Sequence, residues 1–189
     1  MKNTSISRHS KMLQNLYTGL RTEKRRLWNR DLPFDELLFD RAERAQSLGF
    51  GQGASIYQNS YVFGNVKVGK NTWIGPFTIL DGSGGLTIGS FCSISAGVLI
   101  YSHDSVDWAL SGGKASYTHA SVSIGNCCYI GSHTVIAKGV RIGDHAIVGA
   151  SSFVNKDVPP FTIVAGTPCR RIGRIRLNKK GTPKLIFDR

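Results

Sequence analysis

The chain has 189 residues, with 24 Lys or Arg against 12 Asp or Glu and a hydrophobic share of 41%, which suits one folded domain with short extensions. Its 22 glycines do not recur every third residue, which excludes a collagen-like chain, and no stretch reaches the ~18 apolar residues of a membrane span. Positive charge gathers at the ends: residues 161–189 hold eight basic and one acidic residue, whereas residues 51–160 hold six and five.

Residues 1–50 are predicted to form a helical arm. Leucines and other apolar residues fall on one face of a helix over residues 10–30, and a second short helix over residues 35–47 is ended by Gly49. A basic amphipathic arm suits contact with an anionic membrane surface, but packing on the rest of the chain or on a neighbouring subunit is the favoured interpretation. No apolar run typical of a signal peptide follows Met1, so we expect a cytoplasmic protein.

A repeat of six residues dominates residues 51–165. Aliphatic residues recur at this spacing, and glycine often follows them directly. An even period is compatible with short strands whose alternate side chains point inward, and it does not match the helical period of 3.6. Three such sides would close one triangular coil, so the fold class is predicted as all-β, a parallel β-helix. The alternative is an antiparallel β-sandwich, and the number of positions that stay in phase argues against it. The aliphatic positions are Ile56, Val62, Val68, Ile74, Leu80, Ile88, Ile94, Ile100, Ile124, Ile130, Ile136, Ile142, Val148 and Val154.

The repeat is interrupted between Ile100 and Ile124, which predicts a protruding loop over residues 101–123. Insertions in a solenoid lie on one face and often carry function. His103 stands where the coil opens into this loop, and an imidazole there suits a general base for acyl transfer. His119 and Trp108 are candidate acceptor-binding residues of the same loop. His133 and His145 share one place in their repeats and are taken as outward-facing.

Pro159 and Pro160 are expected to mark the end of the coils, and the basic tail over residues 166–189 is expected to be helical or loose. The four cysteines form no CxxC pair, which favours a reducing compartment over a zinc site or a disulfide framework.

The C-terminal half of the chain resembles a known enzyme family. The segments 122–126, 129–132, 142–144 and 148–154 carry the repeat, and they are followed by Lys156-Asp157-Val158-Pro159-Pro160 and Gly166-Thr167-Pro168-Cys169-Arg170. These motifs are similar to those of galactoside, maltose and xenobiotic O-acetyltransferases and of bacterial surface-polysaccharide sugar acetyltransferases. The resemblance covers roughly residues 51–175. It implies a left-handed β-helix, whereas the general rules for crossovers favour the right-handed form.

The resemblance also implies roles for single residues. His103 matches the family's general base, with Asp104 or a backbone carbonyl to orient it. The donor, acetyl-coenzyme A, would be held without a metal ion, by Ser132 near the thioester and Ala150 beside the pantetheine arm. The remaining donor positions are Tyr129, Asn155, Lys156, Arg170 and Arg171, of which the basic ones suit phosphates. The family's homotrimer, with sites between neighbouring β-helices, is expected here.

The acceptor side departs from the family pattern. Pro76 stands where sugar acetyltransferases of this kind have an asparagine, while Asp81 matches their acidic acceptor-binding residue. The expected reaction is transfer of acetyl to a sugar hydroxyl, in surface-polysaccharide or nucleotide-sugar biosynthesis. Sugar N-acetylation and antibiotic O-acetylation remain open. A γ-class carbonic anhydrase and a non-catalytic scaffold or nucleic-acid binder are distant alternatives, the last opposed by the near-neutral middle of the chain.

Overall fold

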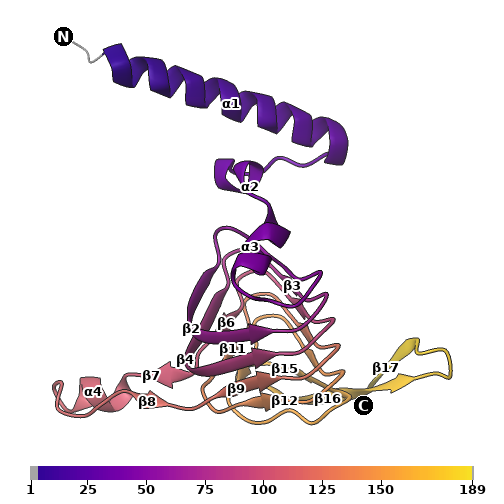
Figure 1. Cartoon of the computed structure of the whole chain (residues 1–189). Coiled ribbons are helices and arrows are strands. Elements are labelled where there is room, and N and C mark those ends of the chain that lie inside the picture. The colour runs from indigo at the N-terminus through magenta and orange to yellow at the C-terminus, as the bar shows by residue number, and fades with distance from the viewer. Residues whose placement is uncertain (1–3, 189) are drawn as a thin grey trace.

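The computed structural model describes residues 4–188, and its body is a three-sided prism of stacked coils (Figure 1). Successive coils pair in parallel, with Ile74 beside Ile94, Ile94 beside Ile130 and Ile130 beside Val148. The predicted parallel β-helix is therefore confirmed.

Three faces make up the prism. The first face consists of β1 (Ser55–Ile56), β3 (Trp73–Ile74), β5 (Ser93–Ile94), β10 (Tyr129–Ile130), β13 (Ile147–Val148) and β15 (Thr162–Ala165). The second face holds the first parts of β2 (Tyr61–Val68) and β4 (Ile79–Ile88), with β6 (Leu99–Ile100), β11 (Val135–Ile136) and β14 (Phe153–Val154). The third face holds the last parts of β2 and β4, with β9 (Val122–Ile124) and β12 (Arg141–Ile142).

The repeat aliphatics form the core that the period of six predicts. Each fully buried Ile or Val contributes roughly 1.5–3 kcal/mol relative to an exposed one, so this column is the main stabilising feature of the fold. Smaller residues four positions later, such as Thr72, Cys92 and Ala146, are buried beside it. The fully enclosed aliphatics include Ile56, Ile74, Leu80, Ile94, Ile100, Ile130, Ile136, Val148 and Val154.

The glycine that follows many of the aliphatics serves to let coils approach each other. A Cβ on Gly131 would lie 2.4 Å from the backbone nitrogen of Ala150 in the next coil, closer than real Cβ contacts allow. The positive φ that closes the corner falls two residues later, at Cys127, His133 and His145. The two histidines that share a repeat position are therefore corner residues.

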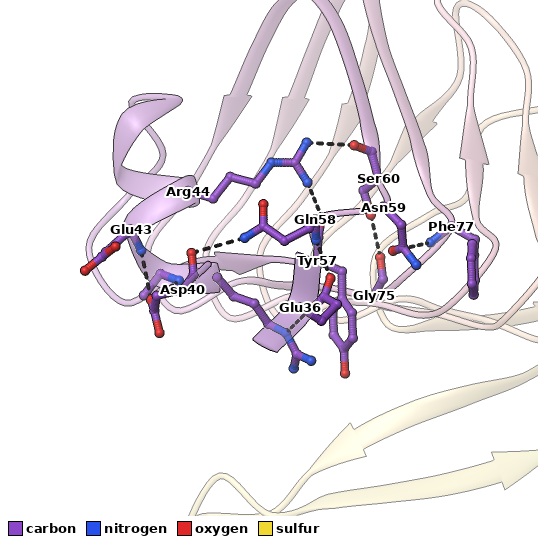
Figure 2. A network of polar contacts seen from close by, with 12 residues as sticks. Glu36, Asp40, Glu43, Arg44, Tyr57, Gln58, Asn59, Ser60, Gly75 and Phe77 are labelled. Carbon is purple, nitrogen blue, oxygen red and sulfur yellow. Dashed lines mark hydrogen bonds and ion pairs between the residues drawn. The ribbon is translucent and has the colours of Figure 1, made fainter. Parts of the chain in front are cut away.

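The two short helices α2 (Phe34–Leu38) and α3 (Arg41–Ser47) cover the first coil, as Figure 2 shows. Glu36 is buried, and its carboxylate accepts hydrogen bonds from the backbone N–H of Gln58 and from Arg41. Arg44 donates to the backbone carbonyls of residues 57 and 60. Because these contacts satisfy the polar groups at the open end of the solenoid, the helices act as its cap.

The arm differs in detail from the prediction. The single helix expected over residues 35–47 is two helices, and Asp40 caps the second by accepting from the N–H groups of residues 42 and 43. The long helix α1 (Thr4–Trp28) lies beyond α2, away from the prism (Figure 1). Tyr17 of α1 packs edge-on against Phe34, with ring centroids 5.7 Å apart.

The C-terminal region also differs from the prediction. The coils do not stop at Pro159 and Pro160, because β15 follows them and pairs with β13. The tail is neither helical nor loose: β16 (Arg170–Leu177) and β17 (Pro183–Phe187) form an antiparallel ribbon that extends the first face and projects from the prism (Figure 1).

Candidate active site

The insertion over residues 101–123 projects sideways from the prism as a hairpin (Figure 1). Strands β7 (His103–Asp104) and β8 (Thr118–His119) pair antiparallel, and the short helix α4 (Val106–Leu110) lies in the segment that joins them. His103 is the first hairpin residue after the coil ends. The hairpin therefore holds His103 at its base, where it meets the body of the protein.

His103 is paired with Asp81 of the preceding coil. The imidazole Nδ1 lies 2.6 Å from the Oδ2 atom of Asp81, whose side chain is 1% exposed, whereas that of His103 is 31% exposed. A carboxylate can only accept, so Nδ1 carries the proton of a neutral imidazole. The other nitrogen, Nε2, is left with a lone pair that can take up a proton.

Four further hydrogen bonds fix the Asp81 carboxylate. Its Oδ1 accepts from the N–H and hydroxyl of Ser83, at 2.9 and 2.6 Å, and its Oδ2 accepts from the N–H and hydroxyl of Ser102, at 2.8 and 3.2 Å. Burial acts to raise the pKa of Asp81, but the hydrogen bonds from Ser83, Ser102 and His103 outweigh it and hold the pKa well below its usual range. The Asp81 side chain is thus an anion that accepts the Nδ1 proton of His103.

Asp104 occupies a different place from the one expected beside the imidazole. Its Oδ2 lies 2.5 Å from Nζ of Lys138, and its Oδ1 accepts from the hydroxyl of Thr118 at 3.1 Å. The hydrogen bond from Lys138 lowers the pKa of Asp104. Asp104 thus joins the hairpin to the next coil, and Asp81, expected to bind the acceptor, is the residue that orients His103. Leu80 and Ile88 are eight residues apart where six is usual, which marks an irregular coil here but does not identify the partner of His103.

A groove of about 430 Å³ opens beside His103. Val135 and Phe153, from successive coils of the second face, supply apolar side chains to its lining, and Lys138 also lines it. The remaining lining residues are Tyr101, Asp104, Ser105, Val106 and Ala137. A groove lined by apolar side chains and one imidazole can hold an uncharged chain next to a base.

The expected donor residues do not all gather at this groove. Ser132 and Ala150 lie at the corner between the first and second faces, which we call the first edge, where Ser151 N–H donates to the carbonyl of Ser132. His103 and Lys138 lie at the corner between the second and third faces, the second edge, and Asn155 and Lys156 follow β14 on that edge. One prism side, roughly 15–20 Å of extended chain, separates the two edges.

The other expected donor residues are spread over the part of the prism that follows the hairpin in sequence. Tyr129 is exposed on the first face. The segment before Arg170 runs beside β14, where Cys169 N–H donates to the carbonyl of Phe153. Arg170 is exposed at the start of β16, and Arg171 pairs with Asp188 at 3.3 Å.

The hairpin carries aromatic side chains next to His103. The His119 ring centroid lies 5.8 Å from that of His103, and the Tyr117 centroid lies 6.0 Å away with the two rings 4° from parallel. Trp108 packs edge-on against Tyr117 at 5.7 Å. The sequence did not single out Tyr117. No signal in the sequence marks it, because its place beside His103 depends on the pairing of β7 with β8.

Within residues 4–188, no three His, Cys, Asp or Glu side chains lie close enough together to bind a metal ion. In the same range no helix is long and apolar enough to cross a membrane.

Comparison with known proteins shows the family. The family model described as bacterial transferase hexapeptide (six repeats) matches residues 121–156. The galactoside O-acetyltransferase of Escherichia coli K12 is 32% identical over 185 residues, which cover 93% of this chain and 90% of the relative. The chain belongs to the hexapeptide-repeat acyltransferases. A chloramphenicol acetyltransferase of Morganella morganii is 35% identical over 105 residues, 46% of this acyltransferase and 50% of the relative.

Solved structures agree with this assignment. A hexapeptide-repeat acetyltransferase of Vibrio cholerae is 28% identical, with a TM-score of 0.63, and covers 87% of this acyltransferase and 98% of its own chain. The N-acyltransferase AntD of Bacillus cereus, solved with dTDP-4-amino-4,6-dideoxyglucose and coenzyme A, is 21% identical with a TM-score of 0.60 over 73% and 90% of the chains, and shows the fold alone. The left-handed β-helix and the acyltransferase assignment predicted from sequence are confirmed.

Proposed function

We propose that this acyltransferase moves an acetyl group from acetyl-coenzyme A to a hydroxyl of a sugar or nucleotide sugar, with His103 as general base. The proposal is carried by the pair of the buried Asp81 with His103, whose imidazole lines the groove. A hydroxyl is a weak nucleophile and needs a base, and a neutral imidazole with a free Nε2 supplies one. The buried carboxylate of Asp81 stabilises the imidazolium that results.

The transfer proceeds in two steps, addition to the thioester and loss of the thiolate. The acceptor oxygen attacks the thioester carbonyl as its proton passes to Nε2 of His103. The tetrahedral intermediate collapses by breaking the carbon–sulfur bond, and the thiolate of coenzyme A takes the proton back from the imidazolium. The products are the acetyl ester and free coenzyme A, and His103 returns to its neutral form.

The donor would lie along residues of the coils that follow the hairpin in sequence. Ser132 suits the neighbourhood of the thioester oxygen, where a hydroxyl or an N–H stabilises negative charge. Ala150 leaves room for the pantetheine arm. Asn155, Lys156, Arg170 and Arg171 are exposed polar or cationic groups that suit the nucleotide and its phosphates, and Tyr129 completes the expected set.

The separation of the two edges supports a site shared by two copies. Because Ser132 and His103 stand on different edges of one prism, a complete site needs the first edge of one copy beside the second edge of another. The second face between these edges bears apolar side chains on its outer surface, which suits packing against another copy. These are Tyr61, Ile79, Leu99, Val135 and Phe153. We therefore propose the homotrimer, in a cytoplasmic location that suits four free cysteines.

The nature of the relatives favours a hydroxyl acceptor. The relative that aligns over 93% of this acyltransferase is a galactoside O-acetyltransferase, and other relatives acetylate chloramphenicol by name. The test is release of coenzyme A thiol from acetyl-coenzyme A with a panel of pyranosides, nucleotide sugars, amino sugars and chloramphenicol. The proposal predicts turnover with a sugar hydroxyl. Turnover confined to amino sugars or to chloramphenicol would show that the acceptor is not a sugar hydroxyl. A protein that does not bind acetyl-coenzyme A would contradict the whole proposal.

A further inference from the structure

The hairpin presents an aromatic surface made of Trp108, Tyr117 and His119, which we call the aromatic wall. Tyr117 and His119 each stack with the imidazole of His103, and Trp108 packs edge-on against Tyr117. None of the three wall residues lines the groove, whereas His103 lines the groove and stacks with Tyr117 and His119 of the wall. The imidazole therefore stands between an apolar groove on one side and an aromatic surface on the other.

The pairing of β7 with β8 explains how the wall is formed. His103 lies directly opposite His119, so the two side chains share one face of the hairpin. Tyr117 is two residues from His119 and falls on the same face. Asp104 and Thr118 form the next opposite pair, and their side chains meet each other and Lys138. One face of the hairpin is thus fastened to the body, and the other presents the aromatic rings.

The rings are held in place but remain open to solvent. Tyr117 is 46% exposed and Trp108 is 44% exposed. A Cβ on Gly113, which has φ +86°, would lie 3.6 Å from the indole nitrogen of Trp108, so the loop backbone passes close to this ring. Aromatic residues that served only to stabilise the loop would gain most by full burial. A half-exposed aromatic surface next to a base instead suits a ligand that has an apolar face.

We propose that Tyr117 is a specificity-determining residue, whose ring stacks against the C–H face of a pyranose acceptor and so brings a ring hydroxyl to Nε2 of His103. The inference rests on the proposed function and deepens it, because it names the chemical class of the acceptor. A pyranose presents a flat, apolar C–H face and carries hydroxyls at its edge, which suits an aromatic ring nearly parallel to the imidazole. An open-chain polyol has the hydroxyls without the face.

The first experiment compares methyl β-D-galactopyranoside and methyl α-D-glucopyranoside with D-sorbitol in the thiol-release assay. The inference predicts that at least one pyranoside is acetylated, with kcat/KM at least tenfold above that for sorbitol. The variant Tyr117→Leu should raise KM for the pyranoside about tenfold, which corresponds to about 1.4 kcal/mol, while kcat and the KM for acetyl-coenzyme A stay within twofold. Tyr117→Phe keeps the ring and should behave like the unaltered protein. Leu110→Ala, in the same loop, is the matched control.

The second experiment measures saturation transfer from the protein to the ring C–H protons of the pyranosides by NMR, and it needs no turnover. Saturation transfer that is present in the unaltered protein and lost in Tyr117→Leu supports stacking of the pyranose on Tyr117, even if no coenzyme A is released. In that case the proposed function is wrong, and the inference about Tyr117 is not. Coenzyme A release with an unchanged KM in Tyr117→Leu, or equal use of sorbitol, overturns the inference and leaves the proposed function standing.

Discussion

His103 and Asp81 lie 22 residues apart in sequence, yet their side chains are joined by a hydrogen bond of 2.6 Å. Leu80 pairs with Ile100 in the next coil, so the residues that follow each of them emerge at the same corner of the prism. Two additional residues in the coil after Leu80 leave room there for Ser83 and the glycines around it. The pairing of Asp81 with His103 is therefore a consequence of the register between coils.

The first prediction concerns the orienting carboxylate. Asp81→Asn removes the charge that stabilises the imidazolium and allows the amide to donate to Nδ1, which favours the wrong tautomer. We expect kcat to fall by about 10²–10⁴, the range typical for loss of acid–base assistance. Ser83→Ala removes one hydrogen bond to the same carboxylate and should cost far less. Steady-state thiol release measures both, and equal activity of Asp81→Asn and the unaltered enzyme would contradict the role given to Asp81.

A second prediction follows from the lowered pKa of Asp81. Its unfolded value is about 3.9, and the folded value is lower, so the carboxylate stabilises the fold fully above pH ~4 and this stabilisation is lost as pH falls toward the folded pKa. The difference in free energy of unfolding between the unaltered protein and Asp81→Asn should therefore shrink between pH 6 and pH 3. Urea unfolding followed by circular dichroism measures it, and a difference that grows in acid would show the opposite sign.

The third prediction concerns the attachment of the hairpin. Lys138→Met removes the partner of Asp104 and should loosen β7 and β8. The pair is partly exposed, so global stability should change by less than about 1 kcal/mol. Hydrogen exchange of residues 103–119 should nevertheless become faster, and the KM for the acceptor should rise. The control is Lys114→Met, which changes an exposed lysine within residues 103–119. Unchanged hydrogen exchange in Lys138→Met would show that the ion pair does not hold the hairpin.

The fourth prediction tests the stacking of coils. Gly131→Ala places a methyl group 2.4 Å from the backbone of Ala150 and should destabilise the protein by about 1–3 kcal/mol, the usual cost of overpacking. Gly19→Ala, in α1, meets no atom within 4 Å and should be neutral or stabilising by up to about 1 kcal/mol, because alanine favours a helix. Thermal unfolding of both variants measures these changes in stability. An unchanged stability of Gly131→Ala would mean that the coils are less tightly stacked than described.

The core of the fold could be predicted because a period of six is local information. Ile74, Ile94 and Ile130 are buried as their spacing requires, and the break after Ile100 marks the hairpin that holds His103. The partner of His103 could not be predicted, because it depends on which corner residues of different coils lie above one another. The ribbon of β16 and β17 was missed because basic residues dominate the composition of this segment, and only Arg174–Leu177 alternates basic and apolar residues as a strand does.

Two features of the site lay outside what one sequence can indicate. Tyr117 is placed beside His103 by the pairing of β7 with β8, which the loop sequence does not specify. The separation of Ser132 from His103 follows from the three-sided cross-section. The two residues can belong to one site only if a second copy places its first edge beside the second edge of the first copy. Residues whose roles depend on contacts between coils or between copies are the ones that sequence patterns leave open.

The role of His103 as base is tested most directly by the rate of coenzyme A release in His103→Ala. The account predicts that kcat falls by about 10²–10⁴ while the circular dichroism spectrum and the KM for acetyl-coenzyme A are unchanged. His133→Asn is the matched control, because His133 is a corner residue with φ +59°, a conformation that asparagine adopts readily, and it should retain full activity. A folded His103→Ala protein that releases coenzyme A at the normal rate would contradict the account.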